Sequence, residues 1–377
     1  MKKILMLSTV ILVLLLLACA PKAVPATVPV TSISQVQTPA STTIKVSDED
    51  AAWQKVIEAA QKEGKASIYT FAYLGDTAIE MRNAFKARYN IQLDLISGRG
   101  AEITERLKTE RRLGNLVADI AEGGSAHLFN MKEAGLLEIA QGLPTLRNKG
   151  DFHVDPLLDQ EGYLLNENLQ NFPPMVNTKL VQPGDVPKSW QDMLNPKWKG
   201  KMLAHSPQIS TGMYVEFIPL LNAKAITVDF LREIGKQDLV FTRGDQETAD
   251  KLARGEAPIT LGLIDTIASS YVKEGAPIKA IPMVEGVTTK SLVVAQVKGG
   301  PHPNAARLFL NWILSPEGQT VYHKSMRTGS VRKDVPDFRP PDLTLPPGTK
   351  LVLETAADAA EEGKKFQEKW LPELWKK

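Results

Sequence analysis

Cysteine is nearly absent from this sequence: Cys19 is the only one among 377 residues, so no disulfide can form within the chain. The five histidines, at positions 127, 153, 205, 302 and 323, are scattered and show no zinc-ligand spacing. The sequence also lacks a Gly-x-Ser-x-Gly nucleophile elbow and a glycine-rich phosphate loop. We therefore expect no catalytic residue, no metal ligand and no cofactor, and we do not expect an enzyme.

An excess of charge of either sign is also missing. The chain contains 45 basic and 43 acidic residues, and residues 1–18 include two lysines and no acid, so the remainder carries 43 of each. A nucleic-acid-binding protein normally shows a basic excess on one face. The charge balance therefore argues against a nucleic-acid partner.

The N-terminus has the pattern of a secretory signal. Lys2 and Lys3 precede an apolar run over residues 4–18, which is shorter than the roughly 20 residues that a membrane-spanning helix needs. The run ends in Leu16-Leu17-Ala18-Cys19, which resembles the lipobox of bacterial lipoproteins. We expect residues 1–18 to be a signal peptide and Cys19 to be acylated, holding the protein on the lipid bilayer. The alternative is an ordinary apolar cysteine inside a signal peptide.

The next segment, residues 19–47, is rich in proline, threonine, serine and valine and lacks a periodic apolar face. Such a composition is typical of a flexible tether. About 330 residues follow it, which is enough for two domains with sizeable cores.

The body of the chain alternates between strand-like and helix-like stretches. Strands are expected at 65–71, 91–96 and 118–121, with helices at 77–88, 101–113 and 125–134. This order predicts a parallel sheet that binds ligands at the carboxyl ends of its strands. A second α/β region spans roughly 189–284, with strands expected at 201–204, 239–241 and 257–263. A β-branched strand at 291–297 and an amphipathic helix at 304–314 follow it.

Several motifs of the second region carry a family resemblance. They are Asn177-Thr178-Lys179-Leu180, the stretch VPKSWQDMLNPKWKGK at 186–201, Arg254-Gly255-Glu256-Ala257, the NAARLFL helix at 304–310 and LSPEGQ at 314–319. In this order and spacing, from about residue 65 to residue 335, the sequence resembles ferric-type extracellular solute-binding proteins of ABC importers.

The resemblance implies a type II periplasmic-binding-protein fold, in which two α/β lobes flank a ligand cleft. Residues 48–172 plus 287–377 would form a discontinuous first lobe, and residues 173–286 an inserted second lobe. Ligand-driven hinge closure would then signal an ABC permease partner.

The resemblance does not by itself imply that this chain binds iron. Proteins similar to this one that hold bare ferric ion usually supply two adjacent tyrosines where this chain has Asp265 and Thr266. The glutamate that the family places after the third strand aligns with Gly124, and its histidine after the first strand has no counterpart in residues 72–74. Ferric ion favours anionic oxygen donors such as phenolate, so a tyrosinate iron site is not expected. The ligand stays open between an iron chelate and an anionic or zwitterionic small molecule.

Candidate ligand contacts lie in the loops that follow the predicted strands. Arg99 can grip an anion in bidentate fashion, with a solvated loop charge as its alternative. Asp245 and Asp265 instead favour an amine, a hydroxyl or a metal. Tyr73 would stack on the ligand, or else pack between loops. The full set of predicted contacts is Tyr73, Arg99, Gly100, Ser125, Ser210, Thr211, Asp245, Asp265 and Thr266.

Together these features predict a monomeric, lipid-anchored, extracytoplasmic protein that captures a small solute or metal chelate for an ABC-type importer. The alternative is a structural or sensory surface lipoprotein of the same fold.

Overall fold

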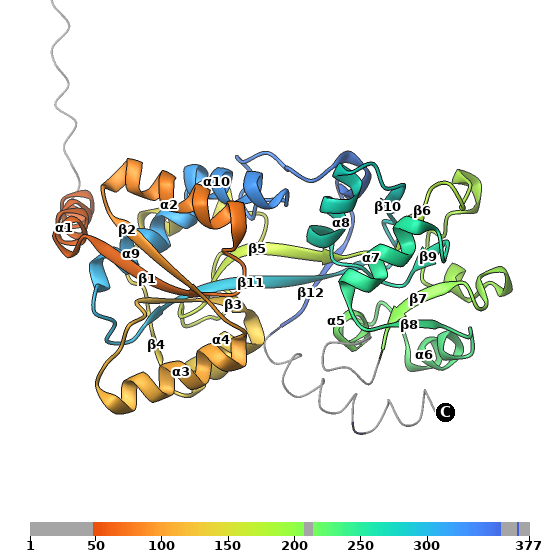
Figure 1. Ribbon diagram of the computed structural model, residues 1–377, viewed down its shortest axis with the longest axis horizontal. Helices are drawn as coiled ribbons and strands as arrows, with labels where there is room; N and C mark the ends of the chain where they lie inside the picture. Colours follow the sequence, from red (N-terminus) through yellow and green to blue (C-terminus); the bar gives the residue numbers. More distant parts are fainter. Residues whose placement is uncertain (1–47, 207–213, 356–367, 369–377) are drawn as a thin grey trace, which may run out of the picture. The chain divides into compact units, whose positions relative to one another are not determined.

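The computed structural model describes residues 48–206, 214–355 and 368, and it contains two sheets, each covered by helices on both faces (Figure 1). The first sheet has the strand order β12-β11-β3-β1-β2, with β4 and β5 also paired to β11. Its strands are β1 (Lys65–Thr70), β2 (Gln92–Ser97), β3 (Ile120–Gly124), β4 (Leu137–Glu138), β5 (Leu165–Phe172), β11 (Val287–Val297) and β12 (Leu351–Leu353). The parallel pairing of β1 with β2 and β3 confirms the predicted parallel sheet, whereas β11 runs antiparallel to β3, β4 and β5.

The helices of this first lobe divide between the two faces of its sheet. They are α1 (Asp48–Glu63), α2 (Gly75–Tyr89), α3 (Gly100–Leu113), α4 (Ser125–Glu133), α9 (Pro303–Ile313) and α10 (Pro316–Met326). Because side chains alternate along a strand, Ile68 of β1 packs in the core under α2, α9 and α10, while its neighbour Tyr69 packs under α3 and α4. Both faces of the sheet are therefore buried, as in other α/β proteins.

The second lobe has a five-stranded sheet in the order β10-β6-β9-β7-β8. Its strands are β6 (Met175–Asn177), β7 (Met202–His205), β8 (Val240–Thr242), β9 (Ile259–Thr260) and β10 (Ile278–Ala280), and its helices are α5 (Tyr214–Asn222), α6 (Val228–Gly235), α7 (Asp245–Arg254) and α8 (Asp265–Lys273). β7 is parallel to both β8 and β9, so the carboxyl ends of these three strands lie at one edge. Trp190 of the predicted family motif is buried against Phe217 and Phe230 on one face.

Short 3-10 helices lie mostly in the connections of both lobes. They are η1 (Pro144–Leu146), η2 (Lys149–Asp151), η3 (Pro183–Asp185), η4 (Gln191–Leu194), η5 (Pro196–Trp198) and η6 (Pro341–Leu343).

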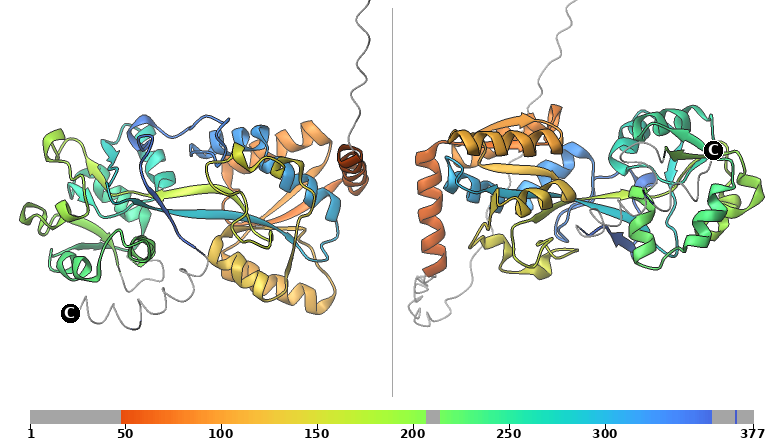
Figure 2. Two further views of the ribbon diagram at one scale, coloured as in Figure 1. Left: turned by 180° about the vertical axis from the view of Figure 1, so that it is seen from behind. Right: turned by 90° about the horizontal axis from the view of Figure 1, so that it is seen from below.

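Two long strands connect the lobes. β5 and β11 pair from Leu165–Val294 to Phe172–Thr288, and Figures 1 and 2 show them running together from one lobe toward the other. β5 leads within three residues into β6, and β11 follows shortly after β10.

The C-terminal segment differs from the predicted lobe boundaries, which assigned residues 287–377 entirely to the first lobe. Leu343 of η6 is fully buried in the core of the second lobe beside Leu263 and Ile278. The chain then returns to pair β12 with the start of β11. Residues 335–350 contain many prolines and no helical or strand periodicity, so their sequence carried no signal for this excursion.

Candidate ligand-binding site

Glu122, near the end of β3, shapes the loop that follows β1. It is buried, and its Oε2 accepts hydrogen bonds from Thr70 Oγ1 at 2.5 Å and from the backbone N–H groups of Phe71 and Ala72 at 2.9 Å each. This anchoring fixes the turn from β1 into α2 and leaves the Phe71 side chain 50% exposed. Glu122 is not among the contacts predicted from the sequence, although its place at the end of a predicted strand is a signal that could have identified it.

Tyr73 lies in the core of the first lobe and not at the surface. Its hydroxyl donates to Glu167, and its ring packs edge-on against Tyr322 and Phe309. Burial, together with the neighbouring carboxylate of Glu122, raises the pKa of Glu167 well above its usual range. The contacts of Tyr73 are those of a packing residue that also donates a hydrogen bond to one oxygen of a buried acid.

Arg99, Gly100 and Ser125 come together at the carboxyl ends of β2 and β3. Gly100 begins α3 and Ser125 begins α4, and a Cβ on Gly100 would lie only 2.2 Å from the ring of His127 in α4. Only glycine lets the two helix N-termini approach this closely. Arg99 is exposed just before α3, and Ser125 is buried. The structure therefore gathers three of the predicted contacts at one sheet end.

The second lobe places a buried ionic cluster at the matching end of its sheet. His205 ends β7, Glu216 lies in α5 and Asp245 begins α7. His205 Nδ1 lies 2.9 Å from Glu216 Oε1, and its Nε2 lies 3.6 Å from Asp245 Oδ1. Asp245 Oδ1 also accepts a hydrogen bond from the backbone N–H of Ile264 at 3.0 Å. Of these three residues, the sequence predicts Asp245 as a ligand contact but neither His205 nor Glu216.

The cluster keeps His205 in its charged form. Burial disfavours the charge, but the carboxylates of Glu216 and then Asp245 outweigh it and raise the pKa of His205 to about 9. Gly262, just after β9, lies against the Glu216 carboxyl group, where a Cβ would approach it to 2.6 Å. Glycine at this position leaves room for the buried acid.

Asp265 and Thr266 lie at the N-terminus of α8, and Asp265 is fully buried. Its Oδ2 lies 3.0 Å from Arg339 Nη1, in the C-terminal segment. Burial raises the pKa of Asp265, although the charge of Arg339 opposes the shift. Thr266 Oγ1 lies 3.4 Å from Asp265 Oδ1. Asp265 thus has a protein cation as its partner.

Two further contacts tie α8 to the first lobe. Ser269 Oγ donates to the backbone carbonyl of Arg327, which follows α10, at 3.3 Å. Arg339 also pairs with Asp337 and packs on Gly329, where a Cβ would lie 2.0 Å from its Nη2. The Asp265–Arg339 pair is therefore part of a connection between the two lobes.

Ser210 and Thr211 lie outside the described residues, as do Cys19 and the predicted tether.

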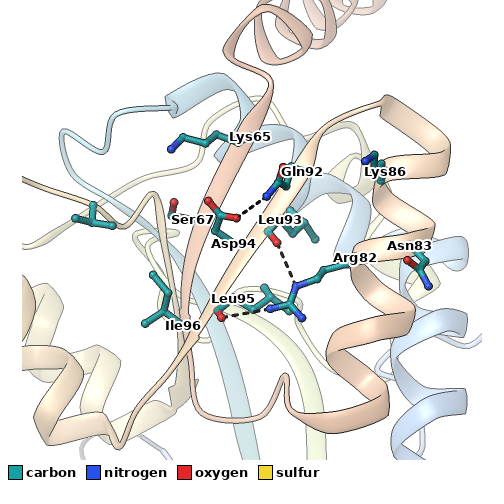
Figure 3. Close-up of a pocket in the computed structure, with 11 residues that line it drawn as sticks. Lys65, Ser67, Arg82, Asn83, Lys86, Gln92, Leu93, Asp94, Leu95 and Ile96 are labelled. Carbon is teal, nitrogen blue, oxygen red and sulfur yellow. Dashed lines mark hydrogen bonds between the residues drawn. The ribbon is translucent and has the colours of Figure 1, made fainter.

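A hollow of about 770 Å³ lies along β2, at the edge of the first sheet, and it includes none of the predicted contacts (Figure 3). Arg82 of α2 reaches across it and donates to the carbonyl oxygens of Leu93 and Leu95 at 3.3 and 3.4 Å. An edge strand exposes such unpaired carbonyl groups, so Arg82 covers part of this edge. We do not assign this hollow to the ligand.

The pKa of His205 generates a first prediction. Because its folded value of about 9 exceeds the ordinary 6.5, its stabilising contribution is complete below pH 6.5 and is lost as the pH rises through 9. The loss should be on the order of 3 kcal/mol in the free energy of unfolding. Urea denaturation between pH 6 and 10 measures it. His205→Gln should remove this pH dependence, and the exposed His153→Gln should leave it intact; equal slopes in all three proteins would contradict the assignment.

The Asp265–Arg339 pair generates a second prediction. Arg339→Met leaves a buried carboxylate without its cation and should lower the free energy of unfolding by about 3–5 kcal/mol. Adding Asp265→Asn should recover part of this loss, because the buried charge is then gone. Arg88→Met, which removes an exposed partner of Glu317, should cost less than about 1 kcal/mol. A double-mutant cycle by chemical denaturation tests the coupling, and additive effects of the two changes would refute it.

Among the described residues, no helix has both the length and the apolar character needed to cross a membrane.

Comparison with known proteins identifies the relatives of this fold. Residues 80–349 match the family model described as bacterial extracellular solute-binding protein. An uncharacterized protein of Haemophilus influenzae is 26% identical over 344 residues, covering 86% of this chain and 94% of that protein.

Two solved structures are similar over almost their whole length. The Trichodesmium protein IdiA (FutA), in complex with iron and citrate, has a TM-score of 0.68 at 19% identity, covering 83% of this chain and 100% of its own. The periplasmic binding protein AfuA of Actinobacillus pleuropneumoniae, with bound fructose-6-phosphate, has a TM-score of 0.62 at 20% identity, covering 83% and 99%. The chain belongs to the bacterial extracellular solute-binding protein family, and its two α/β lobes form the type II periplasmic-binding-protein fold.

Proposed function

We propose that this solute-binding protein is held outside the cytoplasmic membrane by acylated Cys19 and delivers a small polar organic solute to an ABC permease. The observation that carries the proposal is the placement of polar groups at the carboxyl ends of both sheets. Arg99 and Ser125 lie at that end of the first sheet, and His205 and Asp245 at that end of the second. Open α/β sheets bind ligands at these ends.

The paired strands β5 and β11 support capture by hinge closure. They provide a short, continuous connection between the lobes, and a ligand held by residues of both lobes would favour a closed arrangement over an open one. The lobes would comprise residues 48–172, 287–340 and 351–353 in the first and residues 173–286 in the second. The segment around η6 would add to the second lobe.

The chemistry around α8 argues for an organic solute over bare ferric ion. The position where iron-binding members place tyrosines holds Asp265, which is buried and paired with Arg339. A carboxylate already neutralised by a guanidinium is a poor ferric ligand. FutA was solved with iron and citrate and AfuA with fructose-6-phosphate, so this fold accommodates both kinds of cargo.

A thermal-shift screen of the unlipidated chain from residue 20 tests solute capture. The panel contains ferric chloride, ferric citrate, inorganic phosphate, glucose 6-phosphate, glycine and putrescine. A captured solute at one hundred times its Kd should stabilise the folded state by about 2.7 kcal/mol. Arg99→Ala should reduce the shift, whereas Arg112→Ala, at the exposed far end of the same helix, should not. A shift that only ferric chloride produces would contradict the organic-solute proposal.

The lipid anchor is tested separately. Expressed with its leader in a bacterium, the chain should incorporate labelled palmitate and partition with the membrane fraction. Cys19→Ser should abolish both, because the thioether to diacylglycerol requires this thiol. Ser41→Cys in the same variant background restores a thiol outside the lipobox and should not restore labelling. Palmitate incorporation into Cys19→Ser would disprove the anchor.

A further inference from the structure

The cluster at the end of β7 contains buried polar atoms without hydrogen-bond partners. His205 is 5% exposed and Glu216 is 1% exposed. Within the described part of the chain, His205 Nε2 and Glu216 Oε2 make no hydrogen bond, and Glu216 Oε1 has only His205 Nδ1 as a neighbour of opposite charge. Buried polar groups are nearly always paired, so each unpaired one calls for an explanation such as an unplaced ligand or water.

The unpaired atoms are of two kinds. His205 carries a proton on both ring nitrogens when charged, so Nε2–H is a donor without an acceptor. Asp245 Oδ1, at 3.6 Å, is too far away to serve as that acceptor. Glu216 Oε2 is an acceptor without a donor, whereas Oε1 is ion-paired with His205 Nδ1 at 2.9 Å. One missing group must therefore both accept and donate hydrogen bonds.

This requirement separates the possible ligand groups. An ammonium group only donates, so it would leave His205 Nε2–H unpaired and would add a cation beside it. A phosphate or carboxylate group accepts from His205 but meets the two carboxylates of Glu216 and Asp245, which repel it. A hydroxyl group accepts through its oxygen and donates through its hydrogen, and it carries no charge.

We propose that this end of the site binds the hydroxyl groups of a polyhydroxy solute, such as a carbohydrate or a polyol. His205 Nε2–H donates to a hydroxyl oxygen, and the hydroxyl hydrogens are donated to the carboxylates of Glu216 and Asp245. The assignment rests on the proposed solute capture and names the class of solute. The pKa of His205, raised to about 9, keeps this donor in place at neutral pH.

Access to the cluster is consistent with this assignment. Asp245 is the exposed edge of the cluster, with a side chain 26% exposed, and its Oδ1 is already oriented by the Ile264 N–H. At the corresponding end of the first sheet, Arg99 is an exposed cation for which no ion pair is seen among the described residues. A polyhydroxy solute that also carries an anionic group would complement both ends.

Isothermal titration calorimetry on the unlipidated chain from residue 20 tests the assignment. The probes are glucose 6-phosphate, fructose 6-phosphate, myo-inositol, inorganic phosphate, ferric citrate and putrescine. We expect a polyhydroxy probe to bind and Glu216→Gln, His205→Gln and Asp245→Asn each to weaken it at least tenfold. Asp245→Asn keeps an oxygen for the Ile264 N–H and so should fold. Glu256→Gln, on the exposed loop after α7, should bind as tightly as the unchanged protein.

The outcomes separate this assignment from the proposed function. If only inorganic phosphate, ferric citrate or putrescine binds, solute capture stands and the hydroxyl site is refuted. If a polyhydroxy probe binds with the same affinity to the unchanged protein and to a folded Asp245→Asn, a structural water occupies the cluster and the assignment also falls. If no probe in the panel binds, both proposals fail. Circular dichroism of each variant shows which ones are folded.

Discussion

The antiparallel pairing of β5 with β11 is the constraint on which the rest of the molecule depends. These strands belong to the seven-stranded sheet of the first lobe, yet each continues within a few residues into or out of the second sheet. The hydrogen-bonded pairing of β5 with β11 sets where the chain leaves the first lobe and where it returns. Only the short connections from β5 to β6 and from β10 to β11 are left to bend. A register shift between Leu292 and Val293 interrupts the ladder within the first lobe, where β11 also pairs with β3. Such a bulge changes the local twist of a strand.

Buried carboxylates at the strand and helix ends are stabilised in three different ways. Backbone N–H groups and a hydroxyl hold Glu122, the guanidinium of Arg339 holds Asp265, and the imidazolium of His205 faces Glu216. The first arrangement shapes a loop, and the second joins α8 to the C-terminal segment. The third differs because both partners keep unpaired polar atoms, a donor on His205 and an acceptor on Glu216, whereas Glu122 keeps a single unpaired oxygen, Oε1.

Several residues show which features of the structure local sequence patterns can predict. Alternating apolar residues and glycines at strand ends predicted β1 to β3 and the loops that carry Arg99, Gly100 and Ser125, because strand period and turn chemistry are local properties. Tyr73 follows a strand in the same way, yet its ring turns into the core against Tyr322. Its direction depends on Glu167, which is 94 residues distant in the sequence. A loop position by itself does not say which way a side chain points.

Sequence alone determined the α/β class, the family and the strand ends at which polar groups collect. Periodicity, motif spacing and strand–loop order are all local patterns of the sequence. Only the tertiary structure decided which charges meet. No local sequence pattern indicates that His205 and Glu216 form an ion pair. Asp265 pairs with Arg339, which lies 74 residues away in the sequence, in a proline-rich segment without periodicity. The physical reason is that the energy of a buried charge depends on its neighbours in space. Those neighbours are set by the folding of distant segments against one another.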